Sequence, residues 1–308
     1  MSEEIFMDLN AFQSMAESIH LNYSENEPLS HHTSFRIGGP AEIYAEPENT
    51  EQISVLVRFA KEHNIRLLPL GKGSNVLVPD EGLKDIVLHF GQSFSNIELF
   101  DDETIYCQAG TSLTKLCHFA LEHSLTGLEF AYGIPGSVGG AVFMNAGAYG
   151  GEMKDILLYA DHFDENGAAG RFSGEELELS YRHSVYSEKD YFITGAAFHL
   201  HKGDQLEIKT RMEELLSKRY EKQPMDKPSA GSTFKRPEGA FASALIDQCG
   251  LKGLRVGGAV VSEKHAGFVV NDKDATCKDV LKLMELIQKK VQEETGYLLE
   301  SEVRLLKN

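Results

Sequence analysis

A glycine-rich loop, Gly71-Lys72-Gly73-Ser74-Asn75, separates two apolar segments of the sequence. Glycine adopts positive φ angles and lets a ligand approach the backbone closely, and successive N–H groups in such a turn bind anions. The pattern is not a Walker A loop, which has the form G-x-x-x-x-G-K-[ST]. It is also not the G-x-G-x-x-G pattern that begins a helix in dinucleotide-binding proteins. The loop alone therefore fits a tight turn and a phosphate cradle about equally well.

The stretch 132–151, YGIPGSVGGAVFMNAGAYGG, holds too many glycines for a packed strand or helix. Its interleaved apolar residues, Ile134, Val138, Val142 and Met144, indicate an ordered segment rather than a flexible loop. Small residues over this length favour a backbone that packs closely on a large, flat ligand. We therefore expect a ligand-binding role here.

Three short segments carry side chains suited to anion binding or proton transfer, at residues 181–183, 229–237 and 300–304. Ser232 lies in the polar loop SAGSTFKRP, and neither a G-x-S-x-G elbow nor a nearby His-Asp pattern marks it as a hydrolase nucleophile. Glu302 and Arg304 fall on one face of a predicted strand. Each segment also has an ordinary interpretation: a surface cation, a turn serine and a solvated strand edge.

Hydrophobic periodicity predicts the elements that position these segments. Residues 33–90 are predicted as β-β-α-β-β, beginning with a short strand in TSFRIGG, and residues 91–201 as α+β. QPMDKPSAG is predicted to be a break between domains. The predicted helices are 51–63, 112–123, 207–222 and 277–295, the last with Gly296 as its C-cap. A hairpin is expected around residues 101–102, and strands near 156–164, 191–200 and in YLLESEVRLL.

The chain has 308 residues and a formal net charge of −17, from 30 Lys and Arg against 47 Asp and Glu. Such acidity argues against a nucleic-acid-binding protein and against docking on an anionic membrane. No apolar run approaches the roughly 18 residues of a membrane span, and MSEEIFMDLN lacks the features of a signal peptide. The four cysteines form no C-x-x-C pair and no histidine lies at ligand spacing from one, so we predict no metal site and a cytoplasmic protein.

Seven segments in a fixed order are more specific than any one of them. They are TSFRIGGPAE, LGKGSNVLV, IPGSVGGAVFMNAGAYGGE, YRHS, SAGSTFKRP, LKGLRVGGAVVSEKHAGFVVN and ESEVR. This set resembles the UDP-N-acetylenolpyruvoylglucosamine reductase (MurB) family of bacterial flavoenzymes, over about residues 29–305. The continuous GSTFKRPEGAFASALIDQCGLKG segment is similar to the shorter, type II branch of that family.

The resemblance implies an α+β chain with an FAD-binding fold of the PCMH (vanillyl-alcohol-oxidase-like) type, followed by a C-terminal α+β substrate-binding domain. We place FAD-binding subdomain 1 at 1–90, with 297–308 returning near it, subdomain 2 at 91–204, and the substrate-binding domain at 205–296. The implied activity is the reduction of UDP-N-acetylglucosamine enolpyruvate to UDP-N-acetylmuramate, with FAD as cofactor and NADPH as donor. The implied setting is cytoplasmic peptidoglycan synthesis, which serves cell wall biogenesis, cell shape and cell division.

The resemblance also implies roles for individual residues. The expected catalytic residues are Arg182, Ser232 and Glu302. The GKGSN loop corresponds to the family's pyrophosphate loop, and the second glycine-rich stretch lines the flavin. The expected FAD-binding residues are Gly71, Lys72, Gly73, Ser74, Asn75, Gly136, Ser137, Gly139, Gly140 and Asn145. Tyr181, Arg236 and Arg304 are expected to contact the substrate, although Arg236 stands where some relatives have Asn.

These residue types suit the chemistry of an enolpyruvyl ether. Hydride adds to its β-carbon, and negative charge then accumulates as an enolate on the carboxylate side. Arg182, a permanent planar cation, is expected to stabilise that charge. Glu302 is expected to polarise the substrate carboxylate in a protonated or hydrogen-bond-sharing form, because two facing carboxylates repel. Ser232 is expected to protonate the α-carbon.

Two other classes remain open at this point. The first is another flavoenzyme of the same fold with a different small substrate, although the Ser232 and Glu302 segments lie outside the FAD-binding part. The second is a catalytically idle nucleotide-binding module, which would not oxidise NADPH in response to the enolpyruvyl substrate. The expected partners are small molecules, with no nucleic acid and no membrane. The expected ligands are polyanions. We therefore expect N–H groups and a few arginines to bind them locally, although the surface as a whole is acidic.

Overall fold

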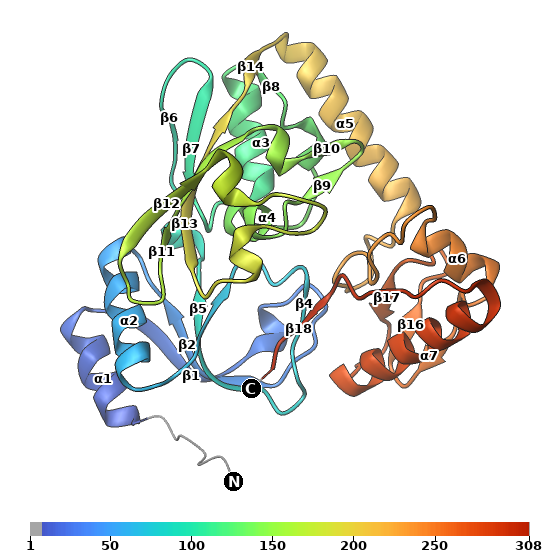
Figure 1. Ribbon diagram of the computed structural model, residues 1–308, viewed down its shortest axis with the longest axis horizontal. Coiled ribbons are helices and arrows are strands. Elements are labelled where there is room, and N and C mark those ends of the chain that lie inside the picture. Colours follow the sequence, from blue (N-terminus) through green and yellow to red (C-terminus); the bar gives the residue numbers. More distant parts are fainter. Residues whose placement is uncertain (1–7, 308) are drawn as a thin grey trace. The chain divides into compact units, whose positions relative to one another are not determined.

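The computed structural model describes residues 8–307, and the chain divides into two compact units (Figure 1). Unit 1 contains the N-terminal residues to Glu25, Ile43–Lys72 and Asp85–Leu216. Unit 2 contains Asn26–Glu42, Gly73–Lys84 and the chain from Ser217 onward. Both units are therefore discontinuous in sequence, and each has its own hydrophobic core. The division into three parts at residues 90 and 204 stays a prediction.

Unit 1 is built on a five-stranded antiparallel sheet of order β12-β11-β13-β7-β6. Its strands are β6 (Ile97–Leu99), β7 (Thr104–Gln108), β11 (Leu157–Phe163), β12 (Ala169–Ser173) and β13 (Phe192–His199). The central strand, β13, is buried over all but its last residue, as expected for a strand with neighbours on both edges. The predicted hairpin at residues 101–102 is confirmed by the antiparallel pairing of β6 with β7.

Shorter elements complete unit 1 around that sheet. Helix α3 (Leu113–Glu122) precedes β8 (Leu125–Thr126), which pairs with β14 (His201–Lys202). Helix α4 (Val138–Phe143) packs against β13 and is followed by the small hairpin β9 (Gly147–Ala148) and β10 (Gly151–Glu152). Helix α5 spans Gln205–Lys222, and its buried Ile208 and Met212 belong to the core of unit 1.

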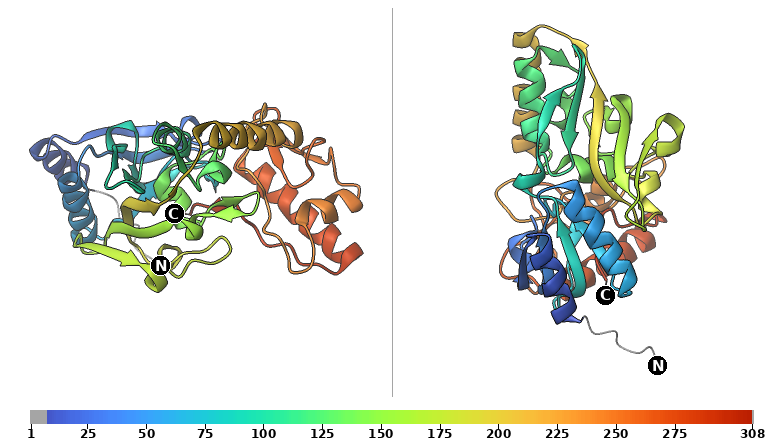
Figure 2. Two further views of the ribbon diagram at one scale, coloured as in Figure 1. Left: turned by 90° about the horizontal axis from the view of Figure 1, so that it is seen from above. Right: turned by 90° about the vertical axis from the view of Figure 1, so that its left-hand side faces the viewer.

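A second sheet has the order β1-β2-β5-β3, with β1 at Asn22–Pro28, β2 at Pro40–Glu46, β3 at Leu67–Leu70 and β5 at Leu83–His89. β3 and β5 run parallel, from Leu67 opposite Ile86 to Leu70 opposite His89. The helices α1 (Leu9–Ser18) and α2 (Thr50–Glu62) lie side by side (Figures 1 and 2). The rings of Phe12 and Phe59 meet edge to face between them, with centroids 5.9 Å apart.

Unit 2 contains a three-stranded antiparallel sheet, β15 (Arg255–Val256), β16 (Ala259–Val261) and β17 (Val269–Asn271). Helix α7 (Cys277–Thr295) packs against β15 and β16, and α6 (Ala242–Gln248) packs against α7. A parallel pair joins β4 (Val76–Leu77) to β18 (Arg304–Leu305). The end of the chain therefore returns to the segment that follows the GKGSN loop.

The predicted helices are confirmed, and side-chain caps explain where they begin. Asn49 accepts a hydrogen bond from Gln52 N–H at α2 (3.0 Å), and Ser112 accepts one from Lys115 N–H at α3 (3.1 Å). At α7, Thr276 and Asp279 form a capping box, which satisfies two of the unpaired donors of a helix start. Gly296 ends α7 in the left-handed conformation, with a φ of 76°.

One predicted strand is wrong, and another is confirmed only in part. TSFRIGG forms a turn, in which Arg36 N–H donates to Thr33 O at 3.1 Å and Arg36 has a φ of 56°. YLLESEVRLL is a strand only at Arg304–Leu305, because its backbone bonds first to one segment and then to another. Lys235 N–H donates to Glu300 O (2.8 Å), whereas Arg304 N–H donates to Asn75 O (3.0 Å). Within residues 8–307, every helix is too short or too polar to cross a lipid bilayer.

Two leucines of α7 test the contribution of the unit 2 core. Leu283 is fully buried, whereas Leu286 is 37% exposed on the same helix. We expect Leu283→Ala to lower the free energy of unfolding by about 2–5 kcal/mol, through lost burial and the cavity left behind. Leu286→Ala, which removes the same atoms from a more exposed position, should cost less than about 1 kcal/mol. Urea unfolding followed by circular dichroism measures both, and equal losses would contradict this core assignment.

Candidate active site

The GKGSN loop connects β3 to β4, and its glycines are required by their surroundings. Gly73 has a φ of 57°, and a Cβ added to it would overlap the carbonyl oxygen of His32. Gly73 O accepts a hydrogen bond from Ser34 N–H at 3.1 Å. Within residues 8–307, the backbone N–H groups of Lys72, Gly73 and Ser74 find no hydrogen-bond acceptor. Three consecutive donors are thus available to an anion, as in a phosphate-binding nest.

The first glycine of this loop meets the second glycine-rich stretch. A Cβ added to Gly71 would overlap Ser137 Oγ, so the two segments are in van der Waals contact. Ser137 is only 2% exposed and directly precedes α4. The structure thus brings together two segments that the family resemblance assigns to FAD binding.

The second stretch contains a helix, contrary to the expectation that its glycines exclude one. Gly139 and Gly140 lie in α4. A Cβ at Gly139 would come within 3.0 Å of Ala109 Cβ, so close packing requires glycine there. At Gly140 the nearest atom to such a Cβ is Ser137 Oγ at 3.6 Å, which leaves this side of the helix open. Gly136 is tied to unit 1 through its carbonyl, which accepts from Leu113 N–H at 3.1 Å.

Asn145 supports the turn that carries the Tyr-Arg pair. Its side chain is fully buried and donates to Ser180 O and to Glu152 Oε2, both at 2.9 Å, while its Oδ1 accepts from Lys154 N–H at 2.9 Å. Every hydrogen-bonding group of this amide is therefore engaged by protein except one acceptor lone pair. Asn145 is placed to position the turn, and its direct contact with FAD stays a prediction.

Tyr181 and Arg182 occupy the tip of that turn, where Ser180 and His183 exchange two backbone hydrogen bonds of 3.2 Å. Arg182 has a φ of 57°, an uncommon conformation for a residue with a side chain. Its Nη2 donates to Gly147 O at 3.3 Å, and its Cζ lies 5.1 Å from the centroid of the Tyr181 ring. The guanidinium is thus oriented by contacts within unit 1.

Ser232 and Glu302 are held on neighbouring segments of unit 2 by the buried residue between them, Thr233. Thr233 N–H donates to Gly267 O (2.8 Å), its Oγ1 accepts from Val269 N–H (2.9 Å), and its carbonyl accepts from Glu302 N–H (2.9 Å). Ser232 itself is exposed, next to Gly231, whose φ is 74°. The Asn75 side chain donates to Glu302 O at 3.1 Å, which joins the end of the GKGSN loop to this pair of segments.

Nearby charged and titratable side chains of unit 2 determine which cations remain available to bind an anionic ligand. Burial lowers the pKa of His265, so its ring is neutral at pH 7 and its Nδ1 accepts from Gly267 N–H at 3.2 Å. Lys227 Nζ lies 2.9 Å from Asp272 Oδ1, and Arg255 lies 2.6 Å from the other oxygen. Hydrogen bonds from these two cations lower the pKa of Asp272 to about 2. Lys227 is therefore already paired within unit 2.

The other predicted site residues are placed as follows. Lys72 is exposed and Ser74 is half-buried in the GKGSN loop. Arg236 lies over the Phe241 ring, with Cζ 4.5 Å from its centroid, and Arg304 lies in β18, two residues after Glu302. By residue range, unit 1 contains the predicted site residues Gly71, Lys72, Gly136, Ser137, Gly139, Gly140, Asn145, Tyr181 and Arg182. Unit 2 contains Gly73, Ser74, Asn75, Ser232, Arg236, Glu302 and Arg304.

Sequence analysis did not single out Thr233 or Tyr149, which lie within the segments described above. Thr233 is buried and fixes both Ser232 and Glu302, whereas its neighbour Ser232 was named because the family resemblance implies its role. Tyr149 stands 40% exposed at the tip of the β9–β10 hairpin, with a φ of 52°. The available signal was the sequence Ala-Tyr-Gly-Gly, in which a large aromatic residue interrupts a run of small ones.

These residues fit an FAD molecule. The fit rests on the consecutive free N–H donors of Lys72, Gly73 and Ser74 and on the open side of α4 at Gly140. A pyrophosphate needs donors and close backbone approach, and a flat ring system needs a surface without side chains. The loop and the start of α4 supply both.

Comparison with known proteins gives a consistent result. Residues 41–173 match the family model described as FAD binding domain, and residues 223–306 match UDP-N-acetylenolpyruvoylglucosamine reductase, C-terminal domain. The chain is 49% identical over 284 residues to the UDP-N-acetylenolpyruvoylglucosamine reductase of Lachnoclostridium phytofermentans, covering 91% of this chain and 92% of that protein. It is 48% identical to the same-named protein of Agathobacter rectalis, over 93% of this chain and 94% of that protein.

A solved structure agrees with these matches. The crystal structure of the UDP-N-acetylenolpyruvylglucosamine reductase (MurB) from Thermus caldophilus superposes with a TM-score of 0.78 at 36% identity, and the match covers 93% of this chain and 99% of that one. The expected α+β fold, an FAD-binding domain of the PCMH type with a distinct C-terminal domain, is confirmed. The chain therefore belongs to the UDP-N-acetylenolpyruvoylglucosamine reductase (MurB) family.

Proposed function

We propose that this chain reduces the enolpyruvyl ether of UDP-N-acetylglucosamine to UDP-N-acetylmuramate, with NADPH as the electron donor and FAD as the cofactor. Family membership supports the reaction, and the anchoring of the Ser232 and Glu302 segments on Thr233 is the observation that carries the mechanism. The reaction provides a precursor of peptidoglycan. Because its substrates are nucleotide sugars and NADPH, we assign it to the cytoplasm. The continuous 231–253 segment supports the type II branch.

The cofactor-binding residues form a continuous set in this proposal. FAD, when bound, would supply the redox chemistry that links NADPH oxidation to reduction of the enolpyruvyl group. The N–H groups of Lys72–Asn75 would bind its phosphates, and Gly136, Ser137, Gly139 and Gly140 would line the ring system. The supporting observations are the free donors of the loop and the contact of Gly71 with Ser137.

Arg182 stabilises the negative charge that builds up on the substrate as hydride arrives. A guanidinium stays charged at every relevant pH and offers a planar fork to a carboxylate. Its hydrogen bond to Gly147 O and its contact with Tyr181 restrict its rotamers before the substrate binds, so little reorganisation is needed in the transition state. Tyr181 and the cations Arg236 and Arg304 complete the proposed substrate contacts.

Ser232 delivers a proton to the α-carbon, and Glu302 holds the substrate carboxylate. A serine hydroxyl is a weak acid, but an enolate is a strong base, so position decides the rate. The exposed Ser232 hydroxyl regains its proton from solvent after each turnover. Glu302 shares a proton with the substrate carboxylate, which withdraws electron density from the enolpyruvyl group. Thr233 sets the positions of both segments through its three hydrogen bonds.

The activity is tested directly with the purified protein, which should be yellow and should release flavin on denaturation. NADPH oxidation should depend on the enolpyruvyl UDP-sugar, and mass spectrometry should show a product that has gained two hydrogens. Protein that cannot be loaded with FAD would contradict the proposal. So would a flavoprotein that oxidises NADPH equally well without that substrate, because it would belong to a different reaction on the same fold.

Ser232→Ala should separate the two halves of the reaction. We expect reduction of the flavin by NADPH to be unchanged and its reoxidation by the enolpyruvyl substrate to slow by about 10²- to 10⁴-fold, the usual contribution of a general acid. Stopped-flow absorbance measures both rates. Ser229→Ala is the matched control, because Ser229 lies in the same loop and the hydrogen bond it makes to Ser34 uses its backbone carbonyl. Wild-type reoxidation by Ser232→Ala would remove this residue from the mechanism.

Gly73→Ala should release FAD for a steric reason. Its φ of 57° strains alanine, and the added methyl would overlap the His32 carbonyl. Gly250→Ala is the control within unit 2, because its φ is 65° but an added Cβ meets no atom within 4 Å. Gly250→Ala should lose about 1 kcal/mol of stability, and Gly73→Ala should lose more because its methyl meets a backbone carbonyl. Only Gly73→Ala should weaken FAD binding, by at least about 10-fold. Flavin fluorescence titration measures this, and equal FAD affinities would contradict the cradle.

A further inference from the structure

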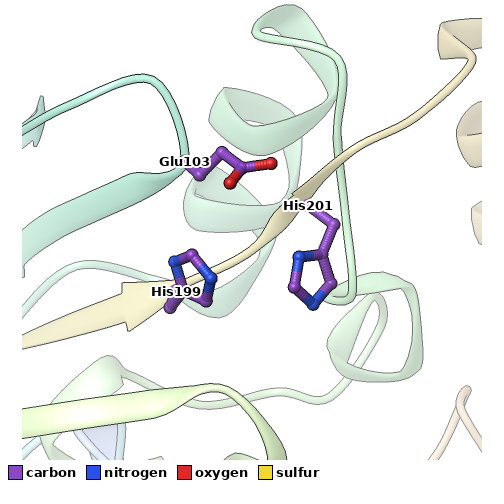
Figure 3. A group of neighbouring side chains, drawn as sticks. All are labelled: Glu103, His199 and His201. Carbon is purple, nitrogen blue, oxygen red and sulfur yellow. The ribbon is translucent and has the colours of Figure 1, made fainter.

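Three side chains with metal-binding atoms converge at the surface of unit 1, outside the proposed active site (Figure 3). They are Glu103, from the turn before β7, and His199 and His201, from the end of β13 and from β14. One ligand atom from each lies within 4.8 Å of the others. Of the residues that the structure describes, no other three His, Cys, Asp or Glu side chains meet this condition.

Strand geometry explains why the two histidines share a face. Leu200 between them is fully buried, and side chains alternate along an extended chain, so both rings point outward. Their centroids are 5.1 Å apart. Register places Glu103 beside them, because His199 pairs with Thr104 and Leu200 N–H donates to Glu103 O at 2.8 Å.

The carboxylate of Glu103 is already oriented by the backbone. Its Oε1 accepts from Lys202 N–H at 3.1 Å, which leaves Oε2 available. Glu103 N–H in turn donates to Asp101 Oδ1 at 2.9 Å. Such outer contacts fix the direction of a metal ligand in known sites. Asp101 and Asp102 add negative charge beside the cluster, in a chain whose net charge is −17.

We propose that Glu103, His199 and His201 bind one divalent transition-metal ion, of the class of Zn²⁺, Ni²⁺ or Cu²⁺. Two imidazoles and a carboxylate select such ions over Mg²⁺ and Ca²⁺, which prefer oxygen ligands alone. Ligands of a tetrahedral zinc ion lie about 3.3 Å apart, a separation that small side-chain rotations reach from the present positions. With three protein ligands and water, the site is open and exchangeable.

The sequence did not indicate this site, because neither histidine lies at ligand spacing from a pair of cysteines. Its signal is His-x-His at the end of a strand, with an acidic residue on the neighbouring strand, and only the fold brings these together. A bound ion would connect the start of β7 to β13 and β14 within unit 1. Since an ion bound only by the folded state stabilises that state, metal binding should raise the thermal unfolding temperature of the protein.

The test uses untagged FAD-loaded protein, stripped of metal with a chelator and titrated with Zn²⁺ by calorimetry. We expect one ion per chain. The double substitution His199→Gln with His201→Gln should weaken binding by more than about 100-fold, and Glu103→Gln by about 10- to 100-fold. The matched control is His31→Gln with His32→Gln. These two rings lie 4.0 Å and 2.8 Å from Glu27 Oε1, but the three side chains do not bring all their ligand atoms within 4.8 Å of one another. This control should bind Zn²⁺ like the wild type.

A second readout keeps the proposal testable if a variant folds poorly. Electron paramagnetic resonance of Cu²⁺ bound to the wild-type protein should show coupling to imidazole nitrogen, and the double variant at His199 and His201 should lose that signal. FAD content and circular dichroism report whether each variant is folded. Unchanged Zn²⁺ affinity in the folded double variant would overturn the proposal, as would loss of binding in the His31 and His32 control alone. Absence of nitrogen coupling in the wild-type protein would overturn it as well.

Discussion

Three hydrogen bonds at Thr233 fix the geometry on which the proposed chemistry depends. One bond ties its N–H to the segment before β17, one ties its hydroxyl to β17 itself, and one ties its carbonyl to Glu302. Each is worth only about 0.5–1.5 kcal/mol net, but a buried donor or acceptor left without a partner costs about 1–3 kcal/mol. The backbone beside Ser232 and Glu302 therefore has little freedom to shift. An exposed serine gains a defined position from a buried neighbour that takes no part in the reaction.

The acidic surface and the anionic ligands are compatible because binding is decided over short distances. Coulomb interactions between exposed charges are screened beyond about 8–10 Å at physiological salt. The net charge of −17 therefore acts on solubility and encounter, whereas the groups proposed to bind the ligands, the N–H dipoles of the GKGSN loop and the guanidinium of Arg182, would act at contact. Several other cations are already neutralised by acidic partners, as Lys227 and Arg255 are by Asp272. The same acidity favours cations at the Glu103 cluster.

Local patterns predicted much of this structure, and the failures share one cause. Helices α2, α3 and α7 were predictable because periodic apolar residues and capping side chains lie within a few residues of each other. The motifs also predicted the site residues, and the structure gives a packing reason for two of them, because a Cβ at Gly71 or Gly73 would overlap Ser137 Oγ or the His32 carbonyl. The prediction for TSFRIGG was wrong, and the prediction for YLLESEVRLL was right only at Arg304–Leu305, because partners far away in the chain decide their conformation. The supporting role of Thr233 and the convergence of Glu103 with His199 depend on such distant partners too.

The discontinuity of unit 2 has a consequence for the order in which the protein is made. Its core joins Phe35, Ile37 and Leu77 to residues of α6 and α7, so early apolar side chains leave the ribosome long before their packing partners. Unit 2 can close only after α7 and β18 have been made, and β4 acquires its β18 partner last. Bringing such distant segments together carries a loop-closure entropy that slows folding. The early segments Asn26–Glu42 and Gly73–Lys84 thus wait for their packing partners, whereas all segments of unit 1 have been made once the chain reaches Leu216.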